Sequence, residues 1–157
     1  MISRRGFLSL AGGSAAILVL SRNLSALEPV HRAAGTKITV YRSASCGCCA
    51  AWVTHLTKNG FDVESRIIDD VEPVKRRHAV PEKLWSCHTA VAGPYVIEGH
   101  VPADLITRVV KEKPAIAGLA APGMPQSAPG MDQGGPHEAY EIISFTRTGE
   151  TTVYARR

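Results

Sequence analysis

The sequence lacks two features that would assign it to large classes of protein. It has no apolar run of membrane-spanning length, since the Gly/Ala-rich run over residues 8–20 falls short of the ~20 apolar residues that a transmembrane helix needs. It also lacks an excess of charge, because beyond the first 26 residues 15 Lys and Arg side chains stand against 14 Asp and Glu. No basic stripe remains to neutralise several phosphates, so nucleic acid is excluded as a partner.

Methionine is scarce as well. Apart from Met1, the chain has only Met124 and Met131, and both follow a Pro-Gly pair, so none is left for the core. The length of 157 residues, with 45% apolar and 20% charged side chains, suits one globular domain. A chain of this size buries a real core, so its four cysteines are not needed as a substitute for one.

The first 26 residues have the pattern of an export signal. Arg4 and Arg5 precede a short apolar run, and small residues at Ala26 or Ala34 offer a cleavage site. The paired arginines resemble a twin-arginine signal, which predicts the periplasm as the destination. Residues 27–35 then form a flexible lead-in. The alternative is an uncleaved signal that acts as an anchor, and this would be the chain's one link to a membrane.

One domain of alternating strands and helices is expected over residues 36–157. Ser45 is the expected N-cap of its first helix, and His55 on that helix is expected to cap or pack. The periodicity predicts strands over 37–41, 61–68 and 95–97, helices over 46–58, 69–79 and 102–113, and a hairpin of 140–145 with 151–155.

The order of these elements predicts an α/β fold with a thioredoxin-like βαβαβ core. A cysteine pair at the first strand-to-helix turn is the thioredoxin arrangement, although another small α/β sandwich would also fit. Residues 82–93 have no clear periodicity. Residues 114–136 hold five of the ten prolines and five of the fourteen glycines, which predicts a long loop that is either functional or disordered.

Three of the four cysteines lie within one helical turn. Cys46, Cys48 and Cys49 stand at a helix N-terminus, where the helix dipole stabilises thiolates. A thioredoxin-type mechanism needs only Cys46 and Cys49, so Cys48 is surplus, and three thiolates in one turn suit a soft metal better. Cys87 and His88 add a thiolate and an imidazole.

Thiolate, imidazole and thioether donors together select copper, especially Cu(I). His100, at the end of a predicted strand, is a further candidate ligand, and Met124 and Met131 could add thioethers from the loop. Two ordinary disulfides are the first alternative, which the crowding of the cysteines disfavours. A structural zinc site is the second, although zinc normally uses two separated Cys-x-x-Cys pairs and only one is present.

Several ordered motifs resemble a bacterial domain-of-unknown-function family that includes the CopG copper-resistance proteins. The resemblance spans roughly residues 37–145. Its motifs are Cys46-Gly47-Cys48-Cys49 with Trp52 and His55-Leu56, Ser86-Cys87-His88-Thr89-Ala90, Glu98-Gly99-His100-Val101-Pro102, Gly118-Leu119-Ala120, Gly123-Met124-Pro125 and Pro129-Gly130-Met131. The resemblance implies a periplasmic thioredoxin-like protein that holds copper as a thiolate-bridged multinuclear cluster. Its ligands would be the three motif cysteines with the later Cys, His and Met residues.

Three functions fit these residues, and whether the protein is an enzyme stays open. The first is a copper-binding protein of copper resistance, with or without cycling between Cu(I) and Cu(II). The second is a thiol–disulfide oxidoreductase, with Cys46 as the attacking thiolate and Cys49 as the resolving one. Pro94 favours it, because it precedes a strand as does the cis-proline that faces the thiol pair in thioredoxins. The third is a chaperone that passes copper to an efflux or delivery protein.

Overall fold

The structure is a computed structural model that describes residues 35–131 and 134–157. The export signal predicted over residues 1–26, and all of the lead-in up to residue 34, lie outside the described residues. Within the described part of the chain, no helix is both long and apolar enough to cross a bilayer.

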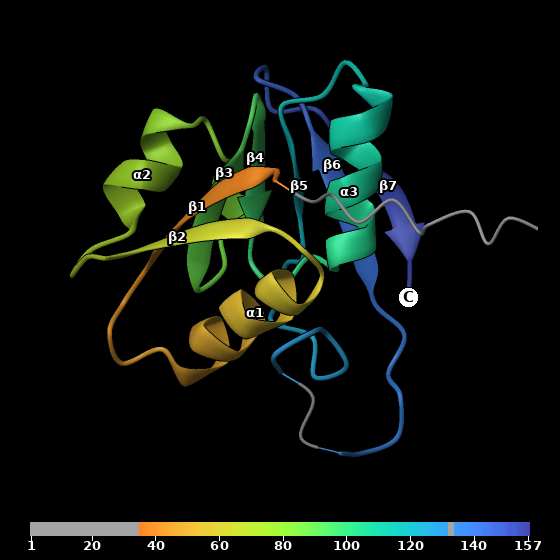
Figure 1. The fold of residues 1–157 in the computed structure, drawn as a ribbon. Helices are drawn as coiled ribbons and strands as arrows, with labels where there is room; N and C mark the ends of the chain where they lie inside the picture. Colours follow the sequence, from red (N-terminus) through yellow and green to blue (C-terminus); the bar gives the residue numbers. More distant parts are fainter. Residues whose placement is uncertain (1–34, 132–133) are drawn as a thin grey trace, which may run out of the picture.

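The described residues form seven strands and three α-helices, which confirms the α/β class (Figure 1). The strands are β1 (Lys37–Arg42), β2 (Asp62–Ile67), β3 (His88–Ala92), β4 (Tyr95–Glu98), β5 (Gly118–Ala120), β6 (Glu141–Phe145) and β7 (Thr151–Arg156). The helices are α1 (Gly47–Lys58), α2 (Glu72–Arg77) and α3 (Ala103–Glu112), with a short 3-10 helix, η1 (Glu82–Leu84).

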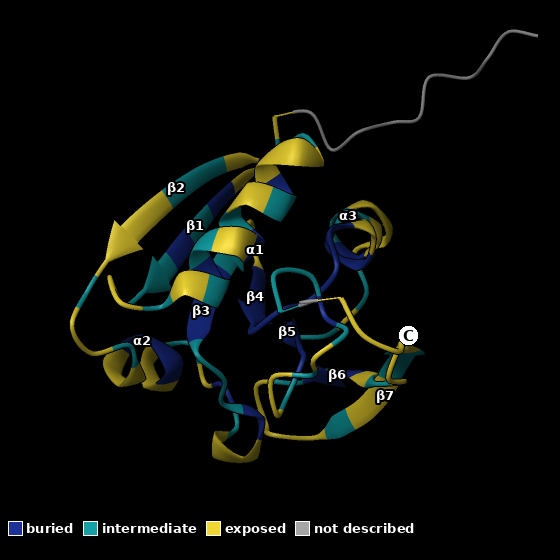
Figure 2. Ribbon diagram, turned by 90° about the horizontal axis from the view of Figure 1, so that it is seen from below, coloured by how far each residue is buried: buried dark blue, intermediate teal, exposed yellow. Residues whose placement is uncertain are grey.

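All seven strands form one mixed sheet in the order β2-β1-β3-β4-β5-β6-β7. The pairs β1–β2 and β4–β5 are parallel, and the other four neighbouring pairs are antiparallel. Figure 2 shows α1 and α3 on one side of the sheet and α2 on the other. The main core therefore lies between the sheet and the α1–α3 layer, and its fully buried members include Ile38, Val40, Trp52, Leu56, Ile97, Ile106 and Leu119.

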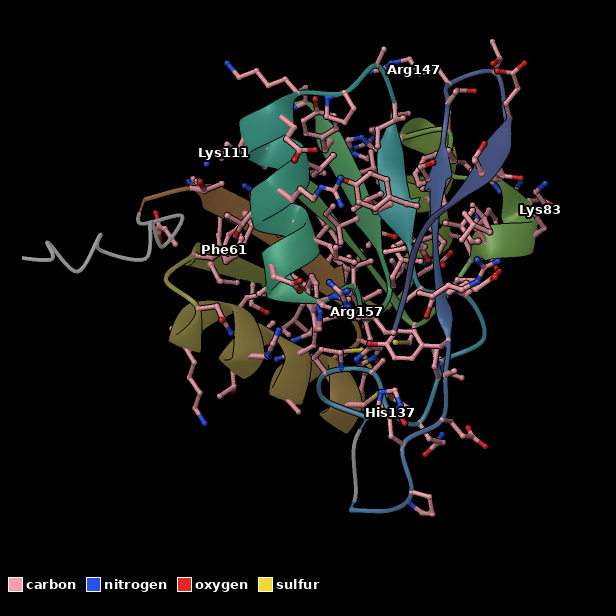
Figure 3. All side chains as sticks on the ribbon, turned by 90° about the vertical axis from the view of Figure 1, so that its right-hand side faces the viewer. Phe61, Lys83, Lys111, His137, Arg147 and Arg157 are labelled. Carbon is pink, nitrogen blue, oxygen red and sulfur yellow. A yellow bond between two sulfur atoms is a disulfide. The ribbon has the colours of Figure 1, made fainter. Side chains whose placement is uncertain are left out.

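Side-chain contacts from α1 and from the end of the chain stabilise the first turn of α3. His55 of α1 accepts the backbone N–H of Ala103 at 3.2 Å, so the expected capping role of His55 is found, on a neighbouring helix. Arg157, which is labelled in Figure 3, pairs with Asp104 of α3. These contacts hold α3 against α1 and the last strand.

Some boundaries differ from the prediction for physical reasons. Cys46, and not Ser45, is the N-cap of α1, because the Ser45 hydroxyl instead contacts Ser43 Oγ at 3.0 Å. The helix predicted over 69–79 spans only Glu72–Arg77. It starts late because the Asp70 carboxylate accepts the Glu72 N–H in a turn.

Two strands were not predicted. β3 lies within residues 82–93, which have no clear periodicity. The pattern did not reveal this strand because its first residues, His88 and Thr89, are polar and yet fully buried. β5 has only three residues and lies inside the expected 114–136 loop, which is therefore interrupted by a buried strand. Within the described residues, the predicted loop therefore consists of the segments on either side of β5.

Candidate metal centre

The first turn of α1 brings three sulfur atoms together. Cys46 and Cys49 form a disulfide with a Cα–Cα distance of 5.3 Å. Cys48 is a free, half-buried thiol whose Sγ lies 3.5 Å from Cys46 Sγ. Cys49 is fully buried, whereas Cys46 keeps some exposure, so the outer sulfur of the pair is the accessible one.

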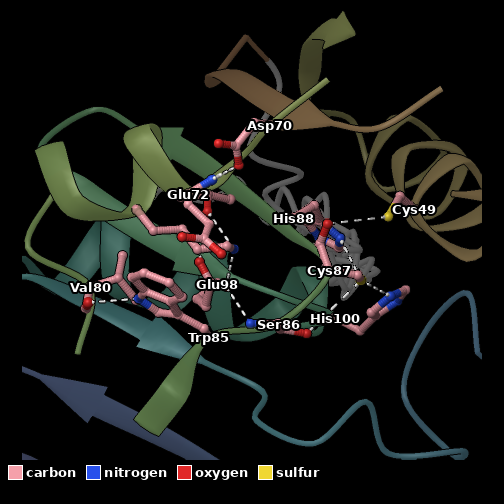
Figure 4. A network of polar contacts seen from close by, with 12 residues as sticks. Cys49, Asp70, Glu72, Val80, Trp85, Ser86, Cys87, His88, Glu98 and His100 are labelled. Atoms are coloured by element: carbon pink, nitrogen blue, oxygen red, sulfur yellow. Dashed lines mark hydrogen bonds and ion pairs between the residues drawn. The ribbon is translucent and has the colours of Figure 1, made fainter. Parts of the chain in front are cut away.

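Cys87 provides the fourth sulfur from the other side of the site. It immediately precedes β3, and its carbonyl oxygen lies 3.9 Å from Cys49 Sγ. Its thiol lies between two imidazoles, 3.3 Å from His88 Nδ1 and 3.2 Å from His100 Nε2 (Figure 4). The antiparallel β3–β4 pairing produces this arrangement, since it sets His88 beside the segment that follows β4.

These residues form two groups that share one sulfur. Donor atoms of Cys46, Cys48, Cys49 and Cys87 all lie within 4.8 Å of one another, and so do those of Cys87, His88 and His100. Six of the eight ligands predicted from the sequence are thus brought together. Figure 3 shows sulfur atoms gathered beside the first turn of α1.

Burial favours the uncharged forms of Cys87, His88 and His100. Burial raises the pKa of Cys87 to about 11, and the neighbouring Cys48 adds to this rise. Burial lowers the pKa of His88 well below its usual value, helped by His100 and Lys75, and burial also lowers that of His100. Neutral imidazoles keep a lone pair free, which is the form that binds a metal.

The His100 imidazole is held by a contact typical of metal ligands, and that of His88 by packing. His100 Nδ1 donates to the carbonyl oxygen of Pro129 at 2.7 Å, which leaves the Nε2 lone pair facing Cys87. Metal-binding histidines usually donate their second N–H to such an acceptor. The His88 ring packs on Trp52 at a centroid distance of 4.4 Å, and its Nε2 is buried without a hydrogen-bond partner. The nitrogen of His88 that faces the Cys87 thiol is Nδ1, and thiols with two neutral imidazoles are a soft donor set that fits copper.

The Pro/Gly-rich loop reaches the site through Pro129 and Gly130. A side chain at Gly130 would lie 2.7 Å from Trp52 N and 2.9 Å from Cys48 O, so only glycine allows the loop to pack on α1 here. Met131 follows directly and is half-buried, whereas Met124 is 45% exposed. The ligand role of the two thioethers stays a prediction.

The expectation about Pro94 is wrong. The described residues contain no cis peptide bond, and Pro94 is exposed in the turn between β3 and β4. The register pairs Ala92 with Tyr95 at this turn and Thr89 with Glu98 at the other end of the hairpin. Pro94 therefore lies at the end of the hairpin away from Cys87, and it does not face the disulfide.

Sequence reasoning missed one pair of residues behind the site. Lys75 of α2 and Glu98 of β4 form a fully buried ion pair. The available signal was a carboxylate that ends the apolar run Tyr95-Val96-Ile97, where a buried charge requires a partner. The lysine itself lies in an ordinary basic stretch and gave no signal.

The chain is similar to one protein family and to two solved structures. Residues 84–131 match the family described as "Protein of unknown function, DUF411". No curated protein matches the chain. Two solved structures, titled "Copper resistance protein copG- Form 2" and "Copper resistance protein copG- Form 1", are each 42% identical to it with a TM-score of 0.73. Each match covers 77% of this chain and 97% or 96% of the other. At that identity over almost the whole length of a copper resistance protein, the chain belongs to the CopG family of copper-resistance proteins.

Proposed function

We propose that this protein binds copper as its cargo in copper resistance, through Cys46, Cys48, Cys49 and Cys87 with His88 and His100. The observation that carries the proposal is the sharing of Cys87 between a group of four sulfurs and a group with two imidazoles. A thiolate sulfur has more than one lone pair, so it can bridge metal ions. Such bridging supports a multinuclear cluster rather than a single ion.

The Cys46–Cys49 disulfide bears directly on this proposal. A disulfide sulfur is not a thiolate, so two of the four sulfurs become full ligands only after reduction. The oxidised chain offers Cys48, Cys87 and the imidazoles, and the reduced chain offers all six donors. We therefore expect the reduced form to carry more copper.

A titration of the anaerobic protein with Cu(I) tests the proposal. Reduced protein should retain more than one copper per chain against a chromophoric Cu(I) chelator, and the oxidised protein should retain fewer. Cys48→Ser and Cys87→Ser should each lower the copper content of the reduced protein. Ser45→Ala, at an exposed position beside the same turn, is the matched control. Full copper loading of both cysteine variants would contradict the proposed ligand set.

The disulfide also favours redox chemistry as a second function. Two Cu(II) ions would each take one electron from the Cys46 and Cys49 thiols, which would join as a disulfide and release two protons. A periplasmic dithiol reductant would then restore the thiols. Mixing reduced protein with Cu(II) should give two Cu(I) per disulfide formed, with free thiols counted before and after.

A thiol–disulfide oxidoreductase remains the alternative, and one variant separates it from the copper function. The strand order β2-β1-β3-β4, with α1 and α3 on one face and α2 on the other, supports a thioredoxin-like core. In such an enzyme Cys46 attacks and the buried Cys49 resolves. Cys48→Ser should then leave disulfide reduction intact. The copper function predicts instead that Cys48→Ser loses copper and that the parent protein has little disulfide reductase activity.

We further propose that the chain is exported to the periplasm by the twin-arginine route, where it would hand copper to an efflux or delivery protein. The pair Arg4 and Arg5 ahead of a short apolar run supports this. Replacing both arginines with lysine should abolish export in a cell-fractionation experiment. Unchanged export of the double lysine variant to the periplasm would indicate another export route or an uncleaved anchor.

A further inference from the structure

A buried polar network lies behind the metal centre, on the α2 side of the sheet (Figure 4). Lys75 Nζ lies 2.5 Å from Glu98 Oε1, and these side chains are 4% and 0% exposed. The same Glu98 oxygen accepts the backbone N–H of Ser86 at 2.6 Å, and Glu98 Oε2 accepts the Thr89 hydroxyl at 2.8 Å. Lys75 Nζ also lies 3.1 Å from Thr89 Oγ1.

This network reaches Cys87 through one residue. Ser86, whose N–H binds Glu98, directly precedes Cys87, and Glu98 precedes Gly99 and His100. The Gly99 N–H donates to the His88 carbonyl at 3.0 Å, while His100 Nε2 contacts the Cys87 thiol. The end of β4 thus contacts the Ser86–His88 segment at several atoms, and Glu98 binds the backbone of the residue just before the Cys87 thiol.

We infer that Glu98, supported by Lys75, is a positioning residue that holds Cys87 between its two imidazoles. The inference rests on the proposed copper function. A buried ion pair is weak evidence for stability, because an apolar pair of similar size is often as stable. What an apolar pair cannot provide here is an acceptor for the Ser86 N–H. Contacts that orient ligands in this way typically change metal affinity by about 10- to 100-fold.

Two double variants isolate that acceptor. Lys75→Met/Glu98→Gln removes both charges and keeps a side-chain oxygen for Ser86, whereas Lys75→Met/Glu98→Leu removes both charges and the acceptor. Arg108→Met/Glu112→Leu, at an exposed ion pair on α3, is the control for charge removal alone. Circular dichroism establishes that each variant is folded.

The first measurement needs no copper. In oxidised protein carrying Cys48→Ser, Cys87 is the one free thiol, and its labelling rate with a maleimide reports how firmly it is held. We expect several-fold faster labelling in the Leu double variant and a parent-like rate in the Gln double variant and the control. The second measurement is Cu(I) retention by the reduced chain with Cys48 present, which should fall about tenfold in the Leu double variant only.

The outcomes separate this inference from the proposed function. Equal labelling rates and equal copper retention in the two double variants would overturn the positioning role while the copper function stands. A parent that binds no copper would overturn the copper function, and the labelling rates would still decide how Cys87 is held. Should the double variants not fold, Thr89→Val removes one hydrogen bond from the Glu98 carboxylate. Cys87 should then be labelled faster than in the parent, and a parent-like rate there would overturn the inference.

Discussion

Gly99→Ala should destabilise the fold at the metal centre. Gly99 has a φ of +68°, where a side chain costs about 1–2 kcal/mol because its Cβ meets the following carbonyl. An added Cβ would also lie 2.6 Å from Ser86 Oγ, 2.8 Å from Ser86 Cβ and 2.9 Å from Ala121 O. Relieving such contacts costs about 1–3 kcal/mol in a packed region. We therefore expect a total loss of about 2–5 kcal/mol.

Gly149→Ala is the matched control. Gly149, in the turn between β6 and β7, has a φ of +86°, but an added Cβ meets nothing within 4 Å. Its substitution should cost only the backbone term of about 1–2 kcal/mol. The difference between the two variants isolates the close approach of Gly99 to Ser86 and Ala121.

Urea unfolding of the oxidised, copper-free proteins measures both losses, since the slope m should stay constant and only the midpoint should move. Gly99→Ala should in addition lower copper retention, because the atoms that must move belong to the residue before Cys87 and to the start of the Pro/Gly-rich loop. Equal midpoints for the two variants would refute this reasoning. So would a large loss for Gly99→Ala with unchanged copper retention, because the site would then tolerate displacement of Ser86.

Three further changes test other parts of the fold and site. Burial lowers the pKa of His55, against an opposing effect of Asp104, so the unfolded chain is protonated first as the pH falls below about 6.5. The contribution of neutral His55 to stability is then fully present above that pH and is lost progressively below it. His55→Gln should therefore flatten the dependence of the urea midpoint on pH, and an unchanged slope would contradict this. Trp52→Phe removes a donor 2.9 Å from a buried carbonyl, so it should cost about 1–3 kcal/mol by calorimetry, and an unchanged melting temperature would count against it. Met124→Leu and Met131→Leu should leave the urea midpoint nearly unchanged and weaken Cu(I) retention, most in the double variant; Leu variants that hold copper like the parent would remove the thioethers from the site.

The sequence was sufficient to predict the helical half of the site. Three cysteines in one turn after a strand predict a sulfur cluster at a helix N-terminus, and the structure has Cys46 as the N-cap of α1. Most core elements were also predictable, because Trp52, Leu56 and Ile106 follow helical periodicity and are fully buried. Local pattern decides such features, so sequence alone reveals them.

The strand half of the site could not be predicted in the same way. Its geometry depends on β3, whose polar residues His88 and Thr89 are buried only because other elements supply their partners. Thr89 is bound by Glu98 from β4 and Lys75 from α2, which lie 9 and 14 residues from it in the sequence and on other elements. The proline before β4 was misread because its position in the hairpin depends on a strand that local pattern did not reveal.

The division of the site between a helix end and a strand pair has a chemical consequence. The disulfide joins Cys46 and Cys49 within α1, so forming or breaking it alters only the helical half. Cys87 and its two imidazoles are held by β3, β4 and the Pro129 carbonyl, none of which belongs to the disulfide. Oxidation therefore removes two thiolates and leaves a thiol with two neutral imidazoles in place. A site built in this way can change the number of its free sulfur donors while the strand half keeps its geometry.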